Sequence, residues 1–346
     1  MRSRRWARGV VVLALAVSLV FSVVAALGMG SVTVSPGTVL DVVLRRGHLV
    51  EGAQVTVIDD RIVWELRLPR VLAAAAAGSV LAQCGALLQA TTRNELADPY
   101  LLGISGGASA GAVVALLTGW SLPGSGPAVG VSLAAFVGGM VALAAVLALA
   151  TGRSGDLPPG RTVLAGVTVS QLAAAVTSTV IMVFADQDGV RMMLAWTFGS
   201  FAGVRAPAAW ALSLLAVITA VACLWAARTM DAFAFGDLSA ASLGVEVRRA
   251  RWLVCVGCAL VVAGTVAFAG PIGFVGLTVP HVLRRLVGVR HGVLLPACAV
   301  GGALLLLWAD TVARTVGAGQ EVPIGVVTAL VGAPVMAILL RRRVAA

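Results

Sequence analysis

The chain has 346 residues, of which 60% are hydrophobic and 12% are charged, whereas soluble domains average about 25% charged residues. This composition excludes an ordinary soluble globular protein. All 25 basic residues are arginine, and the formal charge is +10. Without a lysine the chain has no phosphate-binding loop of the Walker type, so any ATPase must be another polypeptide. The arginines lie in short segments between apolar stretches, a distribution typical of membrane proteins and not of nucleic-acid-binding ones.

Apolar stretches of about 17 to 25 residues recur along the sequence, and each is long enough to cross a hydrocarbon layer of about 30 Å. They predict an all-α, polytopic membrane protein with about ten transmembrane helices, organised as one domain over residues 1–346. The first stretch fits either a cleaved signal peptide or a retained helix, and its length and the lack of a clear cleavage site favour the helix. The expected spans are residues 10–27, 69–90, 97–118, 127–150, 162–184, 207–227, 252–270, 274–288, 292–315 and 324–340.

The distribution of arginine predicts the topology. With the N-terminus in the cytoplasm, 17 of the 25 arginines fall on the cytoplasmic side, as the positive-inside rule requires, and both termini are cytoplasmic. Residues 29–66 are too polar to span and are expected outside, as is a short helix within 186–206. Residues 228–251 form the longest internal loop. Within it, Asp237 is expected to cap a short helix and Gly244 to end it.

Four motifs stand out in chain order. They are Arg67-Leu68-Pro69-Arg70, the segment Arg93-Asn94-Glu95-Leu96-Ala97-Asp98-Pro99 with its continuation to Gly103, the Gly- and Pro-rich apolar run from Gly270 to His281, and Glu321-Val322-Pro323-Ile324-Gly325. The Gly270–His281 run suits an interrupted, closely packed membrane helix. Together, from about Ile62 to Arg343, the motifs resemble the FecCD family of ABC importer permeases. Glu95 stands where that family usually has Pro, and Gly106 replaces a residue that is often Ser or Asn.

The resemblance implies the type II ABC importer permease fold and a place in the cytoplasmic membrane. It implies import of an intact metal chelate by alternating access, most often a ferric siderophore, with cobalamin or haem as alternatives. The expected partners are ABC ATPase subunits, an extracytoplasmic substrate-binding protein, and a second permease, either identical or homologous. No cofactor and no bound metal are expected, because the metal would cross as an intact chelate.

Three arginines gather at the outer face, namely Arg67, Arg70 and Arg314. From spacing alone they are interfacial side chains that carry their charge to headgroup level. The resemblance implies instead that they dock acidic residues of the binding protein. Asp310 is the clear intramembrane carboxylate, and its spacing from Arg314 predicts an ion pair. Because no chain of intramembrane carboxylates accompanies it, the sequence favours coupling to an ATPase over ion-driven transport.

The resemblance also assigns two inner sites. The coupling element that contacts the ATPase includes Gly236, Asp237, Ser242, Leu243 and Gly244, a short rigid body joined to two spans. The translocation path is lined or flanked by Gly103, Ser105, Gly106, Pro280 and His281.

Other functions were considered for the same residues. Gly103-Ile104-Ser105-Gly106 fits the G-x-S-G pattern of rhomboid proteases, with His281 or His291 as a distant base, although small residues more often serve helix packing. A single His at a helix break is expected to bond freed carbonyls and not to hold a metal. The pair Cys255 and Cys258 is expected to be buried packing, because the second pair that a zinc site needs is absent from the sequence.

Overall fold

A computed structural model describes residues 2–30, 32–49, 55–124, 126–152, 155–316 and 321–344. Glu51 and Arg153, which entered the charge analysis, lie outside these residues. The described elements are all helical. They are α1 (Arg2–Gly28), α2 (Pro36–Arg46), α3 (Val57–Asp60), the π-helix η1 (Arg61–Arg67), α4 (Leu68–Thr92), the 3-10 helix η2 (Pro99–Leu102), α5 (Ile104–Thr118), α6 (Pro127–Ala150), α7 (Pro159–Phe184), α8 (Gln187–Thr197), α9 (Ala206–Phe233), α10 (Asp237–Ser242), α11 (Val247–Ala269), α12 (Val275–Val287), α13 (His291–Thr315) and α14 (Ile324–Val344).

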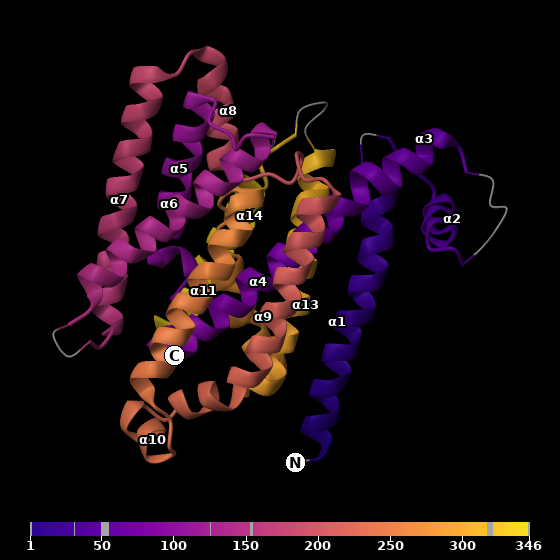
Figure 1. The fold of residues 1–346 in the computed structure, drawn as a ribbon. Coiled ribbons are helices and arrows are strands. Elements are labelled where there is room, and N and C mark those ends of the chain that lie inside the picture. Colours follow the sequence, from indigo (N-terminus) through magenta and orange to yellow (C-terminus); the bar gives the residue numbers. More distant parts are fainter. Residues whose placement is uncertain are drawn as a thin grey trace.

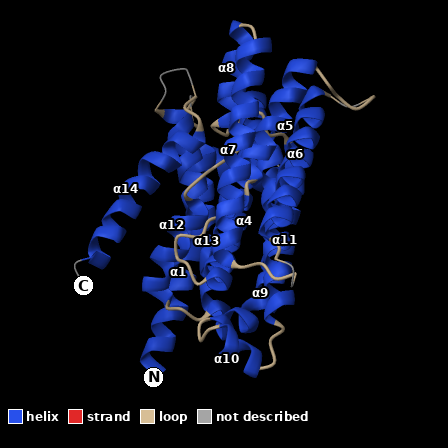
Figure 2. Cartoon of the chain, turned by 90° about the vertical axis from the view of Figure 1, so that its left-hand side faces the viewer, coloured by secondary structure: helices blue, strands red, loops and turns tan. Residues whose placement is uncertain are grey.

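The molecule has two distinct ends (Figure 1). The N-terminus and α10 lie at one, here called the inner end, and α2, α3 and α8 lie at the other, here called the outer end. Figure 2 shows the long helices running between these ends, with α14 leaning away from the rest. The segments that the sequence placed outside therefore share one end, and the long internal loop lies at the opposite end.

The all-helical membrane architecture is confirmed. Seven helices in the described residues are long and apolar enough to cross a membrane, one of them the continuous run Val57–Thr92. The shorter helices α5, α12 and α14 occupy the three remaining predicted spans. The predicted start at residue 97 was wrong, because Arg93 adopts a left-handed conformation that ends α4 and a turn with η2 precedes α5. The long helix therefore begins only at Ile104.

Helix α4 forms the centre of the bundle and packs on α9, α11, α12 and α13. Glycines allow its backbone to touch two neighbours directly. A Cβ atom added to Gly78 would lie 2.0 Å from the carbonyl oxygen of Gly302 on α13, and one added to Gly85 would lie 1.9 Å from that of Gly276 on α12. Such contacts are the usual means of tight helix association in membranes, where burial of apolar surface gives no net drive.

The predicted helix interruption is present between α11 and α12. Gly270 and Phe274 both have positive φ angles, of 69° each, so neither helix continues through residues 270–274. The backbone amide of Ile272 donates to the Tyr100 hydroxyl at 2.8 Å, and the Gln89 side chain donates to the Gly276 carbonyl at 3.2 Å. Side chains thus satisfy backbone groups that a continuous helix would have paired internally.

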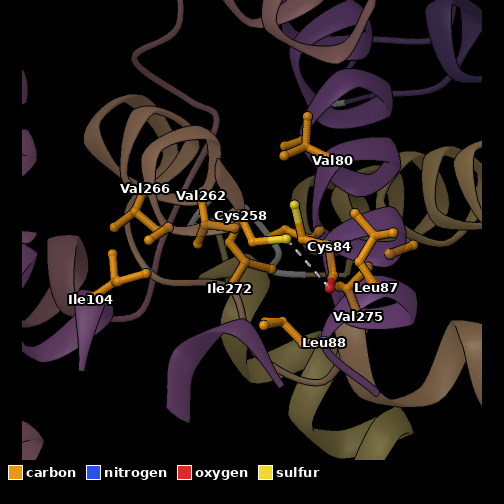
Figure 3. Packing of buried hydrophobic residues seen from close by; sticks show 14 of the residues in the cluster. Val80, Cys84, Leu87, Leu88, Ile104, Cys258, Val262, Val266, Ile272 and Val275 are labelled. Atoms are coloured by element: carbon orange, nitrogen blue, oxygen red, sulfur yellow. Dashed lines mark hydrogen bonds between the residues drawn. The ribbon is translucent and has the colours of Figure 1, made fainter. Parts of the chain in front are cut away.

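The five cysteines belong to the packed interior. All are free and buried, at positions 84, 223, 255, 258 and 298. Figure 3 shows Cys258 of α11 against Cys84 of α4, where its thiol donates to the Cys84 carbonyl at 3.9 Å. Val80, Val262 and Ile272 surround them, which agrees with the expected role in packing.

Candidate functional site

Two of the three outer arginines bind the end of α1. Arg67 is 6% exposed, and its guanidinium donates to the carbonyls of Leu27 and Gly28 at 2.7 and 3.0 Å and also to that of Val32. Arg314 donates to the Ala26 carbonyl at 2.5 Å. The last carbonyls of a helix have no partner within it and carry partial negative charge, so cations satisfy them well. Arg67 and Arg314 therefore cap α1.

The third arginine lies at the centre of an ionic network. The Arg70 Nε donates to both oxygens of Asp310, at 2.9 and 3.0 Å, and its Nη1 donates to those of Glu321, at 2.8 and 2.9 Å. Arg314 lies 3.9 Å from Asp310. The ion pair predicted between Asp310 and Arg314 exists, but the closer partner of this carboxylate is Arg70 on α4. The sequence missed that contact because 240 residues separate the two.

The structure thus brings Arg67, Arg70 and Arg314 together, as predicted, but all three point into the protein. The prediction that they are interfacial side chains is wrong, because each has partners within the chain and little contact with solvent. Within this network the accessible group is Glu321, whose side chain is 46% exposed. We call Arg67, Arg70, Asp310, Arg314 and Glu321 the outer arginine cluster.

The loop at the inner end contains the predicted short helix, α10. Gly236 precedes it with φ 95° and ψ 163°, and Gly244 follows it with φ 85°, so Gly244 ends the helix as expected. Asp237 does not cap the helix with its side chain. Its carboxylate instead accepts from Arg251 of α11 at 3.0 and 3.2 Å, while Ser242 bonds the Ser239 carbonyl within α10. The prediction of an Asp237 cap was therefore wrong.

Large apolar side chains around α10 face solvent. Phe235 is 74% exposed, Leu238 is 90% exposed and Leu243 is 66% exposed. The sequence analysis named only Leu243, although Phe235 and Leu238 are large apolar residues in a loop of small and charged ones, which was a usable signal. Exposed apolar groups at a membrane protein's aqueous end indicate a protein-binding surface.

Helix α10 is fixed to the bundle at its base. Asp231 in the last turn of α9 accepts from the backbone amide of His291 at 2.8 Å, and the His291 ring Nδ1 lies 2.8 Å from the same oxygen. This carboxylate from another helix caps the start of α13. On the other side of α10, the Arg251 guanidinium lies 5.9 Å from the centre of the Phe233 ring. The exposed loop is therefore connected to α9, α11 and α13.

The predicted path residues near α5 lie between helices. Gly103 has a φ of 75° at the junction of η2 and α5, and an added Cβ atom would lie 3.3 Å from Val146. One added to Gly106 would lie 3.3 Å from Ser170 and Ala173 of α7. Ser105 is half-buried. These small residues allow α5 to pack against α6 and α7.

Pro280 and His281 are buried on α12. The His281 ring has side-chain partners, with its Nδ1 3.2 Å from Glu95 and its Nε2 3.3 Å from Arg285. The expectation that it bonds freed carbonyls is not what these contacts show. Glu95, at the position where the family usually has Pro, thus links the turn after α4 to α12. The two groups of path residues are on different helices, whose preceding segments meet where Tyr100 bonds Ile272.

The geometry does not favour a protease. The contacts of the two candidate bases are with acidic groups, His281 with Glu95 and His291 with Asp231. Over residues 55–124 and 155–316, no described hydrogen bond joins Ser105 to either imidazole. No group of three or more His, Cys, Asp or Glu in the described residues is arranged to hold a metal ion.

A central glycine-lined helix, an interrupted pair α11–α12 and short helices at both ends define the transmembrane subunit of a type II ABC importer. The chain belongs to the FecCD transport family, whose sequence model matches residues 18–342. It is 39% identical over 288 residues to the vitamin B12 import system permease BtuC of Vibrio cholerae, covering 82% of this chain and 84% of that one. It is 42% identical over 282 residues to the cobalamin import system permease BtuC of Halobacterium salinarum, covering 82% and 74%. An inward-facing structure of a metal-chelate type ABC transporter superposes with a TM-score of 0.82 at 28% identity, over 96% of this chain and 99% of that one.

Proposed function

We propose that this chain is the permease subunit of an ATP-driven importer of cobalamin. Relatives with 39% and 42% identity over 82% of the chain are named for that substrate, which supports cobalamin over the siderophore that the sequence analysis ranked first. A corrin chelate is bulky and crosses as an intact molecule, so the permease needs no metal ligands of its own. Ferric siderophore and haem are the competing substrates in the test below.

The observation that supports ATP coupling is the exposed apolar surface around α10. The chain has no lysine for a phosphate-binding loop, so energy must arrive through contact with another protein. Phe235, Leu238 and Leu243 form a surface for an ATPase subunit, and Gly236 and Gly244 set the shape of that loop. Movement of α10 would pass to the bundle through the contacts with α9, α11 and α13. The inner end is then cytoplasmic, in agreement with the arginine distribution.

A polar face on α7 supports a translocation path shared with a second permease. Thr168, Gln171, Ser178 and Thr179 are all exposed on this helix, and their spacing places them on one side of it. A face turned to lipid would be apolar, since polar groups in hydrocarbon are costly. This face therefore suits a water-filled path between two permeases. Gly103, Ser105 and Gly106 act behind it by holding α5 against α7.

Docking of a binding protein at the outer arginine cluster would require exchange of partners. Arg67, Arg70 and Arg314 are already bonded, so an incoming carboxylate would have to replace Glu321 on Arg70. Glu321 is accessible enough for such an exchange, whereas Asp310 is 1% exposed and stays in place. Glu321→Gln should then bind the binding protein more tightly than wild type, and an unchanged or weaker affinity would place docking elsewhere on the outer end.

The deciding experiment measures ATP hydrolysis by this permease with its ATPase in lipid vesicles. The binding protein is added empty or loaded with cobalamin, ferric siderophore or haem. Stimulation by the cobalamin form alone is the expected result. Stimulation by another chelate would retain the importer and change its substrate, and failure of an ATPase to associate at all would refute the proposed function.

A further inference from the structure

A wide apolar groove lies among α5, α6 and α7, on the side of the molecule away from α1 (Figure 1). Its volume is about 960 Å³. Helix α5 forms one wall from Gly107 to Thr118, and α6 and α7 contribute residues including Val137 and Leu172. Thr118 supplies the one lining hydroxyl among the groove's described residues, and it already donates to the Val114 carbonyl at 2.8 Å. The groove therefore offers nothing to a polar ligand.

The groove is continuous with the lipid-facing surface of α6. Leu133, Val137 and Val141 line it and are also 36%, 51% and 64% exposed. Val129, one turn before Leu133, extends the same exposed stripe beyond the groove at 51%. Because hydrocarbon chains already cover this stripe in a bilayer, the groove opens directly to them.

The length of the groove matches one leaflet. From Gly107 to Thr118 the α5 wall rises about 16 Å at 1.5 Å per residue, close to half of a hydrocarbon layer of about 30 Å. At its inner limit, Arg161 of α7 donates to the Leu149 carbonyl of α6 at 3.1 Å and so links the two helices. A spanning helix of a partner would need a groove twice as long. An acyl chain from a single leaflet fits the observed length.

The mouth of the groove has the residue expected at a headgroup. Trp120 follows α5 at the outer end, lines the groove and is 46% exposed. Tryptophan favours the boundary between hydrocarbon and headgroup, because its ring is apolar and its N–H can bond polar groups.

We propose that the groove among α5, α6 and α7 binds an acyl chain of a phospholipid from the leaflet at the outer end, with the headgroup beside Trp120. The bound chain packs against Leu172 and Val176 of α7 and fills the space that separates this helix from α6. Under the proposed function α7 is also a wall of the translocation path, so the lipid would support that wall from behind. The lipid site itself does not depend on the substrate or on the ATPase.

The test fills the groove from two walls. Val114→Trp on α5 and Val137→Trp on α6 each place an indole in it, and Val217→Trp makes the same change on α9, where the side chain is 60% exposed and lies outside the groove. Purified permease, washed free of bulk lipid in detergent, is titrated with dioleoylphosphatidylglycerol and dioleoylphosphatidylcholine and weighed by native mass spectrometry. We expect one tightly held lipid per chain for wild type and Val217→Trp, and at least tenfold weaker binding for the two groove variants. Similar results with both lipids would show that the tail, and not the headgroup charge, is recognised.

Two results would overturn the proposal. Equal lipid binding by all four proteins would show that the groove is not the site. Loss of the dimer mass in the groove variants, with lipid binding retained, would show that a second copy of the chain occupies the groove. Thermal unfolding gives an independent check, because added lipid should raise the melting temperature of wild type and Val217→Trp but not that of Val137→Trp. This outcome separates from failure of the importer proposal, since no ATPase or binding protein is present.

Discussion

The outer arginine cluster and the α10 loop are both proposed to meet partner proteins, yet they are built in opposite ways. In the outer cluster, Arg70 and Asp310 are buried and bonded to each other. Around α10, Leu238 is 90% exposed, and the nearby ion pair of Asp237 with Arg251 lies at the base of the loop. One region keeps charge inside, and the other leaves apolar side chains outside.

The difference shows how each region is stabilised before any partner arrives. Buried charges need partners at once, because desolvation costs several kcal/mol for each ion. The outer cluster therefore satisfies itself within the chain and joins α1, α4, α13 and the segment before α14. An exposed leucine costs far less, so the α10 loop can wait for a partner. Substitutions in the outer cluster should thus affect folding, and substitutions on α10 should affect association.

The largest expected effect is on stability at the outer cluster. Arg70→Met should destabilise the permease by about 3–5 kcal/mol, because it leaves Asp310 charged and buried without its main partner. Thermal unfolding of the purified protein measures this. The double variant with Asp310→Leu should recover much of the loss, since the unpaired charge is gone. If Arg70→Met melts like wild type, the network is not a stabilising feature and the contrast between the regions fails.

The next effect concerns association at the inner end. Leu238→Asp should leave the melting temperature unchanged and abolish binding of the ATPase, because a charge would enter an apolar contact. Co-purification and ATP hydrolysis measure the two properties. Leu49→Asp is the matched control, since Leu49 is 74% exposed at the outer end. A variant that still binds the ATPase normally would remove α10 from the interface.

A smaller effect is expected from the backbone at Gly236. Its φ of 95° and ψ of 163° are in a region used almost only by glycine, so Gly236→Ala should cost about 1–3 kcal/mol locally. Amide hydrogen exchange should become faster in α10 and stay the same elsewhere. Gly257→Ala is the control, because that helical glycine has open space for a Cβ atom and the change should stabilise slightly. Unchanged exchange in α10 would mean that the loop shape does not depend on this residue.

The smallest effect is expected at the turn between the two regions. Glu95→Gln removes a charge 3.2 Å from the His281 ring, and the Glu95 side chain is 41% exposed. Because exposed ion pairs contribute about 0–1 kcal/mol, the melting temperature should change little. Transport rate in vesicles is the sensitive measurement, because the pair connects the turn after α4 to α12. A large loss of stability would show that Glu95 has a role closer to that of the buried cluster.

Much of the fold followed from the sequence because membrane spans depend on local composition. The apolar stretches predicted the helices, and the positive φ angles at Gly270 and Gly244 followed from where glycine is needed. The start of α5 was predicted too early, since a composition window does not register the left-handed Arg93. Local pattern thus predicted the elements and missed a boundary set by one residue's conformation.

The candidate sites were harder to predict because their geometry depends on residues far apart in the chain. The gathering of three arginines at one face was predictable from topology. Their inward direction was not, because it depends on Glu321 and on the end of α1. Likewise, Asp237 was a reasonable helix cap until Arg251 of α11 was seen to bind it. The exposed Phe235 and Leu238 could have been found, as apolar residues in a polar loop.

The capping of α1 has a consequence for biogenesis. During synthesis α1 enters the membrane first, but the cations that satisfy its last carbonyls come later, Arg67 about 40 residues on and Arg314 288 residues after Ala26. Until α13 has been inserted, one end of α1 has carbonyls that only water or lipid headgroups can serve. The first helix to be made is therefore among the last to reach its final bonding. A ribosome stalled before Arg314 should hold an α1 that proteases or crosslinkers still reach at its outer end.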